Sequence, residues 1–220
     1  MRYLLNNLDD AWALTIIHLR LSLIPIVLGL LIAVPLGALV QRTTALRRLT
    51  TITASIIFTI PSLALFVALP LIIPTRILDE ANVIVALTLY TTALLVRAVP
   101  EALDAVPGHV LDAATAVGYR PLTRMLKVEL PLAIPVLIAS LRVVAVTNIS
   151  MVSVGSVIGI GGLGTWFTEG YQADKSDQII AGIIAIFVLA IVVDTVIMLI
   201  GRAITPWVRA NRGARVKAGA

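Results

Sequence analysis

The sequence offers few side chains whose type and spacing would support catalysis. Cysteine is absent, and the only two histidines, His18 and His109, are far apart in the chain. A thiolate nucleophile, a disulfide and a cysteine metal site are therefore excluded, and a histidine-based metal centre is disfavoured. No group of carboxylates or histidines is spaced for acid–base work at a membrane face. We therefore predict no metal site and no enzyme activity for this chain.

The chemically unusual residues are instead charges inside apolar stretches, namely Arg97, Arg142 and Asp194. Charged side chains at such depth in a membrane are costly, and they are usually paired or face a cavity. One of the three would then lie on a transport path, or Asp194 would be the ion-pair partner of Arg142 or Arg97. We favour the ion pair.

The composition indicates an integral membrane protein. The chain has 220 residues, of which 59% are hydrophobic and 13% charged, whereas soluble domains are about half apolar and a quarter charged. The net charge of +5 does not indicate nucleic-acid binding, because the basic residues are confined to particular loops.

Five stretches approach the length of about 20 apolar residues that a membrane-spanning helix needs: 20–40, 50–73, 82–103, 131–158 and 179–203. The fourth ends in a Ser- and Gly-rich turn near the far surface. We predict an all-α, polytopic membrane protein with a transmembrane domain over 20–203. Residues 1–19 would be an extracytoplasmic segment, either an amphipathic surface helix or an outward extension of the first span. Residues 204–220 would form a basic cytoplasmic tail.

Lysine and arginine predict the orientation, because they are enriched in cytoplasmic loops. Alternate connections contain Arg42, Arg47, Arg48, Arg120, Arg124, Lys127, Arg202, Arg209, Arg212, Arg215 and Lys217. The others contain Arg2, Arg20, Arg76 and Lys175 among the carboxylates Asp9, Asp10, Asp79, Glu80, Glu169, Asp174 and Asp177. The N-terminus is therefore expected outside and the C-terminal tail inside.

The cytoplasmic segment 107–130 reads as two short helices joined by a turn. Gly118 suits a left-handed C-cap, and Pro121 suits the first turn of the second helix. Pro131 would then mark re-entry into the membrane. An apolar ridge would comprise Leu122, Met125, Leu126 and Leu130. These residues alone leave two interpretations open, a docking element for a partner protein or a hairpin on the membrane surface.

Polar side chains within the spans are candidates for a transport pathway or for helix packing. Ser55, Thr59 and Ser62 would share one face of the second span. Late in the fourth span come Asn148, Ser150, Ser153 and Ser156. The following glycines would form an outer gate or a receptor-docking surface, and these are Gly159, Gly161, Gly162 and Gly164.

Other residues have simpler interpretations. Glu101 and Asp104 follow the third span and either orient the cytoplasmic segment or are solvated at a helix end. Glu129 is expected to serve solvation, with Arg124 or Lys127 as alternative partners. Trp166 is expected at the outer membrane interface.

The cytoplasmic segment resembles the signature of permease subunits of binding-protein-dependent ABC importers, which is Glu-Ala-Ala, three residues, Gly, nine residues, an aliphatic residue, any residue, Leu-Pro. In this chain Asp112, Ala113 and Ala114 begin the pattern, Gly118 is its glycine, and Val128, Leu130 and Pro131 end it. The spacing matches throughout, and Asp112 replaces Glu. The stretches TIPSLALFVALPLII and GSVIGIGGLG also look like permeases of osmoprotectant importers, with methionine-importer permeases as the nearest competitor.

The resemblance implies a five-span permease fold in which the cytoplasmic segment couples the pore to ATPase subunits. It implies two ATPase chains, a second permease (the same chain or a sister), an extracytoplasmic receptor and import of a quaternary-amine osmoprotectant. The chain lacks a phosphate-binding Gly-x-x-x-x-Gly-Lys-Ser/Thr loop, so ATP would be hydrolysed by the partner and no cofactor would be bound here. The alternatives are a permease for an amino acid such as methionine, or a stand-alone secondary transporter.

Overall fold

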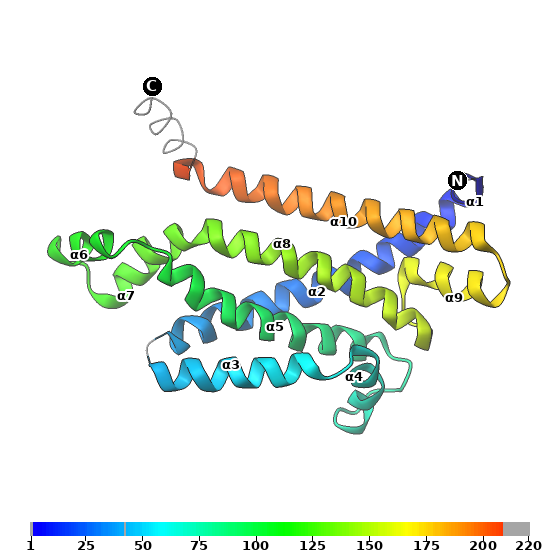
Figure 1. Cartoon of the computed structure of the whole chain (residues 1–220), viewed down its shortest axis with the longest axis horizontal. Helices are drawn as coiled ribbons and strands as arrows, with labels where there is room; N and C mark the ends of the chain where they lie inside the picture. The colour runs from blue at the N-terminus through cyan, green and yellow to red at the C-terminus, as the bar shows by residue number, and fades with distance from the viewer. Residues whose placement is uncertain (1, 42, 209–220) are drawn as a thin grey trace.

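In the computed structural model, residues 2–41 and 43–208 are described, and they form an elongated helical bundle without β-strands among them (Figure 1). The helices of the first half are α1 (Arg2–Asn6), α2 (Leu8–Val40), α3 (Thr44–Thr59), α4 (Ser62–Ala68) and α5 (Glu80–Asp104). Those of the second half are α6 (Gly108–Ala116), α7 (Pro121–Arg124), α8 (Leu130–Gly155), α9 (Thr165–Gln172) and α10 (Ser176–Ile204). One end of the bundle is formed by α6 and α7, which we call the α6–α7 end, and the opposite one is the α9 end.

Five crossings of the bundle correspond to the five predicted spans. Four are single helices, namely α2, α5, the continuous helix Pro121–Ile158 that contains α8, and α10. The second crossing is a bent pair, in which α3 and the helical stretch Ser62–Leu71 meet at 89°. The predicted second span, 50–73, is therefore present as a broken helix, and the sequence did not indicate the break. The bend falls at Pro61, which cannot donate a helical hydrogen bond and which restricts Ile60 to the extended backbone seen there.

The central helix is α5, which packs against α2, α3 and α8. Its contact with α2 depends on glycine: a Cβ atom on Gly29 would lie 2.3 Å from Thr91, and one on Gly37 would lie 2.5 Å from Val99. Small residues let two membrane helices approach closely and gain van der Waals contact. Figure 1 accordingly shows α5 between α3 and α8, with α2 behind them.

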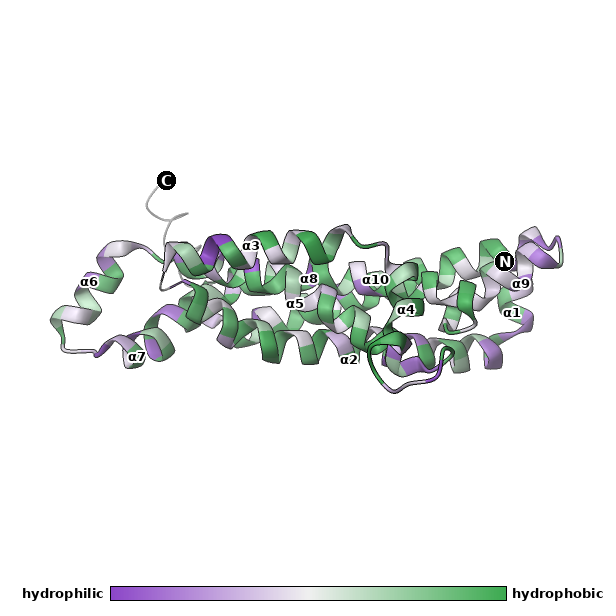
Figure 2. Cartoon of the chain, turned by 90° about the horizontal axis from the view of Figure 1, so that it is seen from below, coloured by the Kyte–Doolittle hydropathy of each residue, from purple (hydrophilic) through white to green (hydrophobic). Residues whose placement is uncertain are grey.

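The membrane-spanning surface has two characters. Hydrophobic residues cover the middle of the bundle and hydrophilic ones gather toward its ends (Figure 2). On α2 between residues 23 and 39, and on α10 between 180 and 200, every exposed side chain is apolar. By contrast, α3 exposes Thr53, Ser55 and Thr59 among its apolar side chains. The faces of α2 and α10 are therefore suited to lipid, and that of α3 is less so.

The N-terminal segment packs on the bundle. Helix α2 begins at Leu8 and continues without a break past residue 20, as expected if this segment extends the first span. The buried indole of Trp166 donates a 2.8 Å hydrogen bond to Asp10 and meets the ring of Tyr3 edge-on at 5.4 Å. Trp166 is therefore buried in the contact between the N-terminus and α9 and is not exposed as an interfacial anchor.

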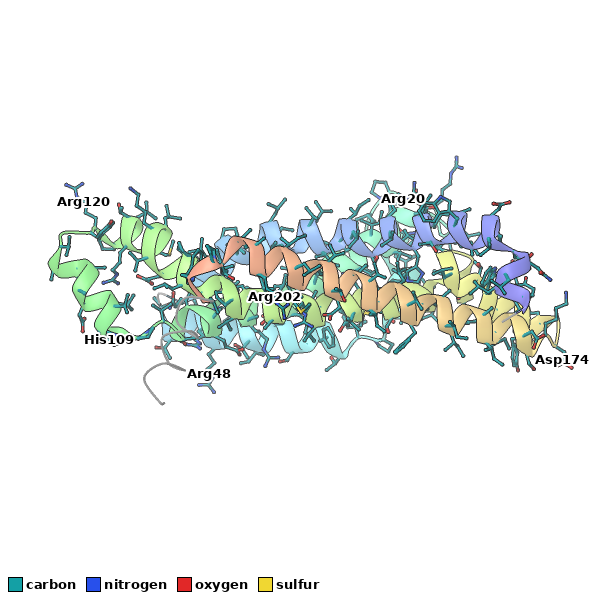
Figure 3. The ribbon with its side chains drawn as sticks, turned by 90° about the horizontal axis from the view of Figure 1, so that it is seen from above. Arg20, Arg48, His109, Arg120, Asp174 and Arg202 are labelled. Carbon is teal, nitrogen blue, oxygen red and sulfur yellow. The ribbon has the colours of Figure 1, made fainter. Side chains whose placement is uncertain are left out.

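Basic and acidic residues of the loops lie toward opposite ends of the bundle. Figure 3 shows Arg48, His109 and Arg120 at the α6–α7 end and Asp174 at the α9 end. The loops that were predicted to be basic and acidic therefore gather at opposite ends of the bundle. Arg42, Arg209, Arg212, Arg215 and Lys217, which were counted in the orientation prediction, lie outside the described residues.

Candidate functional site

The turn after α6 is built around Gly118. Its φ is +93°, a left-handed conformation that glycine adopts without steric cost. The amide of Tyr119 donates to the carbonyl of Ala114, and that of Gly118 donates to Thr115. This pair of hydrogen bonds is a Schellman motif, which satisfies carbonyls at the end of the helix. The predicted C-cap at Gly118 is confirmed.

The second short helix is continuous with the span that follows it. Helix α7 begins at Pro121 and passes through a π-helical turn, Met125–Glu129, directly into α8. Pro131 therefore does not interrupt the helix, and re-entry into the membrane at this residue stays a prediction. In the wider turn Leu130 donates to the carbonyl of Met125, five residues back, and Pro131 falls in the first turn of α8, where a missing amide is tolerated. Because no break separates α7 from α8, a movement of the α6–α7 pair would be transmitted directly to α8.

An arginine connects the two arms of the pair. Arg124 donates from Nε to Glu129 and from a terminal nitrogen to the hydroxyl of Thr115, each at 2.8 Å. Glu129 is only 7% exposed, so its predicted role in solvation is wrong and the alternative pairing with Arg124 is confirmed. The sequence pattern gave no indication of the contact with Thr115, which joins α6 to α7 and stiffens the pair.

The pair presents an apolar surface that is unpartnered within the described chain. Leu122 and Leu126 of the predicted ridge are 58% and 53% exposed, and Val117 in the turn is 81% exposed. Met125, Leu130 and Pro131 are half-buried. Asp112 and Ala113 are exposed, whereas Ala114 is buried. Val117 was not among the predicted ridge residues, although its place directly before a glycine C-cap in a solvent-facing turn was an available signal.

The predicted pathway residues on the second span do not share one helix face. Ser55 and Thr59 are exposed on α3, and their hydroxyls donate to carbonyls of their own helix. Ser62 belongs to α4, beyond the 89° bend. The prediction of a single continuous face is wrong, because Pro61 ends the helical periodicity on which it relied.

The polar residues of α8 divide into two groups. Asn148 is buried between helices and donates a 2.8 Å hydrogen bond to Thr91 of α5, so it contributes to helix packing. Ser150 is exposed. Toward the α9 end, Ser153, Ser156 and Gly159 line a cavity of about 890 Å³ together with Thr165 and Glu169. The structure therefore brings part of the predicted pathway set to one hollow.

The glycine turn after α8 is buried among helices. Gly159 is exposed at φ +81°, but residues 160–164 are buried. Cβ atoms on Gly161, Gly162 and Gly164 would approach Ser156, His18 and Ser153 to 2.8 Å or less. The alternative of a receptor-docking surface is therefore wrong for residues 160–164, which fix α8 against α2.

The intramembrane charges are not equivalent. Arg142 of α8 and Asp194 of α10 form two parallel hydrogen bonds, each 2.7 Å long, so the predicted ion pair is confirmed for Arg142. Arg97 of α5 is exposed and takes no part in it. Among the described residues, no group of three or more histidine or acidic side chains is placed to hold a metal ion.

These features define a class of protein: a polytopic helical membrane protein whose bundle carries a stiff, protruding helix pair with an apolar surface. The family model described as binding-protein-dependent transport system inner membrane component matches residues 12–210, and the chain belongs to this family. It is a permease subunit of an ABC importer, a pore component and not an enzyme, and the ATPase is a separate chain.

Curated relatives cover nearly the whole chain. It is 33% identical to the osmoprotectant import permease protein OsmW of Salmonella typhimurium, over 94% of this chain and 97% of that protein. It is 32% identical to the choline transport system permease protein OpuBB of Bacillus subtilis, with 94% of each covered. The glycine betaine/carnitine/choline transport system permease protein OpuCB of Bacillus subtilis is also 32% identical, again with 94% of each covered.

A solved structure confirms the fold. A chain of the MetNI methionine ABC transporter in an inward-facing conformation superposes with a TM-score of 0.76 at 25% identity, covering 93% of this chain and 97% of that one. The family implies in general an ATPase, a partner permease and a substrate-binding protein, and it places this multi-pass chain in the inner membrane.

Proposed function

We propose that this chain forms half of the translocation pathway for a quaternary-amine osmoprotectant such as glycine betaine, choline, carnitine or proline betaine. The observation that carries the proposal is the similarity to permeases with these named solutes over more than nine-tenths of the chain. An amino-acid permease or a stand-alone secondary transporter is not favoured.

In this proposal, the α6–α7 pair docks on one of two ATPase subunits. The exposed Val117, Leu122 and Leu126 would be buried in the ATPase contact. Arg124 would keep the pair rigid, and the continuous helix from Pro121 into α8 would transmit ATPase closure to the membrane. A second permease, either another copy or a sister chain, completes the pore, and a receptor delivers the solute at the α9 end.

The orientation follows from charge. The basic loops at the α6–α7 end are expected in the cytoplasm and the acid-rich α9 end outside. The pathway would begin at the cavity lined by Ser153, Ser156 and Gly159, and it would continue along the polar side of the bundle rather than along the lipid-facing sides of α2 and α10.

Uptake of radiolabelled glycine betaine, choline and carnitine tests this function. It is measured in cells that contain the ATPase and receptor, with and without this chain. We expect uptake of at least one of these solutes to be lost without the chain and restored on its return. Restored uptake of methionine alone would refute the osmoprotectant assignment.

A further inference from the structure

The two arginines within the spans differ in what neutralises them. Arg142 is held by both carboxylate oxygens of Asp194. Arg97 is exposed and forms no ion pair or side-chain hydrogen bond with any described residue. Because charges in membrane-spanning segments face a cavity or a partner, Arg97 needs water or an anionic group opposite it.

An acidic residue accompanies Arg97 on the same helix. Glu101 lies four residues further on, about 6 Å along the helix axis, and it is exposed too. This spacing allows an ion pair within a helix, yet Glu101 also has no side-chain partner among the described residues. The nearby Asp104, by contrast, pairs with Arg47 at 2.7 Å. One face of α5 thus carries an available cation and an available anion one turn apart.

The packing of α2 shows which face this is. Val99 lies two residues from both Arg97 and Glu101, and it is the residue that Gly37 of α2 contacts. Side chains two residues apart in a helix project about 200° from each other. Arg97 and Glu101 therefore lie on the side of α5 turned away from α2, between α3 and α8 (Figure 1). This side does not belong to the apolar faces of α2 and α10 described above.

We propose that Arg97 and Glu101 form a two-charge contact for a zwitterionic solute in the part of the pathway nearest the α6–α7 end. Arg97 would donate hydrogen bonds to the carboxylate, and Glu101 would attract the cationic nitrogen, which has no N–H to donate. The contact favours a betaine or carnitine over choline, whose only charge is repelled by Arg97. This inference rests on the proposed function and narrows its solutes to zwitterions.

The test uses the complete importer in proteoliposomes, with a receptor that binds both radiolabelled glycine betaine and choline. Arg97→Gln should lower uptake of glycine betaine about tenfold or more, the effect of losing one hydrogen bond to a charged group. Choline uptake should stay level or rise, because the substitution removes a charge that repels this solute and choline has no carboxylate that Arg97 could bind. Arg97→Lys should restore part of the betaine uptake, and Glu101→Gln should lower the uptake of both solutes.

The matched control is Arg48→Gln, which removes an exposed arginine at the α6–α7 end of α3 (Figure 3). It should leave the betaine-to-choline ratio unchanged. If Arg97→Gln lowers the uptake of both solutes equally and weakens assembly of the permease pair, the inference is overturned. Arg97 would then contact the second permease subunit instead of the solute. Unchanged uptake of both would overturn it also. A wild-type importer that carries choline alone would refute the inference but not the proposed function, whereas one that carries neither solute would refute the proposed function itself.

Discussion

The chain contains two glycine turns at opposite ends of the bundle, and they need glycine for different reasons. At Gly118 the backbone is left-handed with φ +93°, and a Cβ atom would meet nothing within 4 Å. At Gly162 φ is +40°, and a Cβ atom would lie 2.7 Å from that of His18 and 2.8 Å from the His18 backbone. The first turn is determined by its own hydrogen bonds, and the second by the approach of α2.

This difference corresponds to the roles we propose. The Gly118 turn is exposed and keeps its shape without support, so its surface remains available to an ATPase. The buried turn at residues 160–164 holds α8 against α2 and has little surface to offer. Substitutions in the two turns should therefore separate coupling from folding.

The largest effect is expected for Gly162→Ala. The new methyl group would meet the backbone of His18 in an already left-handed conformation, which should destabilise the fold by about 3 kcal/mol. The Tm of the purified permease in detergent should fall, and uptake should be lost with it. An unchanged Tm would contradict the assignment of this turn to helix packing.

Gly118→Pro should abolish uptake while the protein still inserts and keeps nearly its wild-type Tm. Proline fixes φ near −65° and removes the amide that bonds to Thr115, so the α6–α7 turn cannot form. Solute uptake and ATP hydrolysis are measured together in the assembled importer, where hydrolysis should no longer drive transport.

The control for this change is Gly118→Ala. Its methyl group has open space, and its left-handed backbone should cost only about 1–2 kcal/mol, so most uptake should remain. Normal solute-stimulated uptake in Gly118→Pro would refute the coupling role of the segment.

An intermediate effect is expected for Arg124→Gln. The change leaves the buried carboxylate of Glu129 without its charged partner, at a cost of about 1–3 kcal/mol, and releases α6 from α7. Uptake per ATP hydrolysed should fall severalfold while the membrane bundle stays folded. Adding Glu129→Gln should recover part of the loss, and a double-mutant cycle on uptake measures the coupling. Additive effects would exclude the proposed link.

The smallest effect is expected for Gly159→Ala, in the same turn as Gly162. Gly159 has φ +81° but open space around its Cβ position, so only backbone strain of about 1 kcal/mol applies. Its Tm should lie close to wild type. A loss as large as that of Gly162→Ala would mean that backbone conformation, rather than crowding by His18, determines the need for glycine here.

Much of the architecture could be predicted from sequence, because hydropathy and capping depend on residues near one another. Such local patterns predicted the five crossings, the C-cap at Gly118 and the turn after Gly155. The bend at Pro61 and the continuity of α7 with α8 were not predicted, since proline within a membrane helix is compatible with either a straight or a broken helix. At Pro131 the helix continues because the π-helical turn Met125–Glu129 precedes it and leads directly into α8.

The sequence by itself determined that this is a five-span membrane protein with a helix pair between its third and fourth spans. It also indicated that Arg97, Arg142 and Asp194 needed partners. Only the tertiary structure decided that Asp194 pairs with Arg142, 52 residues away, that Asn148 is used for packing, and that Arg97 remains available. The physical reason is that a buried polar group is paired by whichever helix lies beside it, and the helix neighbours are set by packing across the whole bundle.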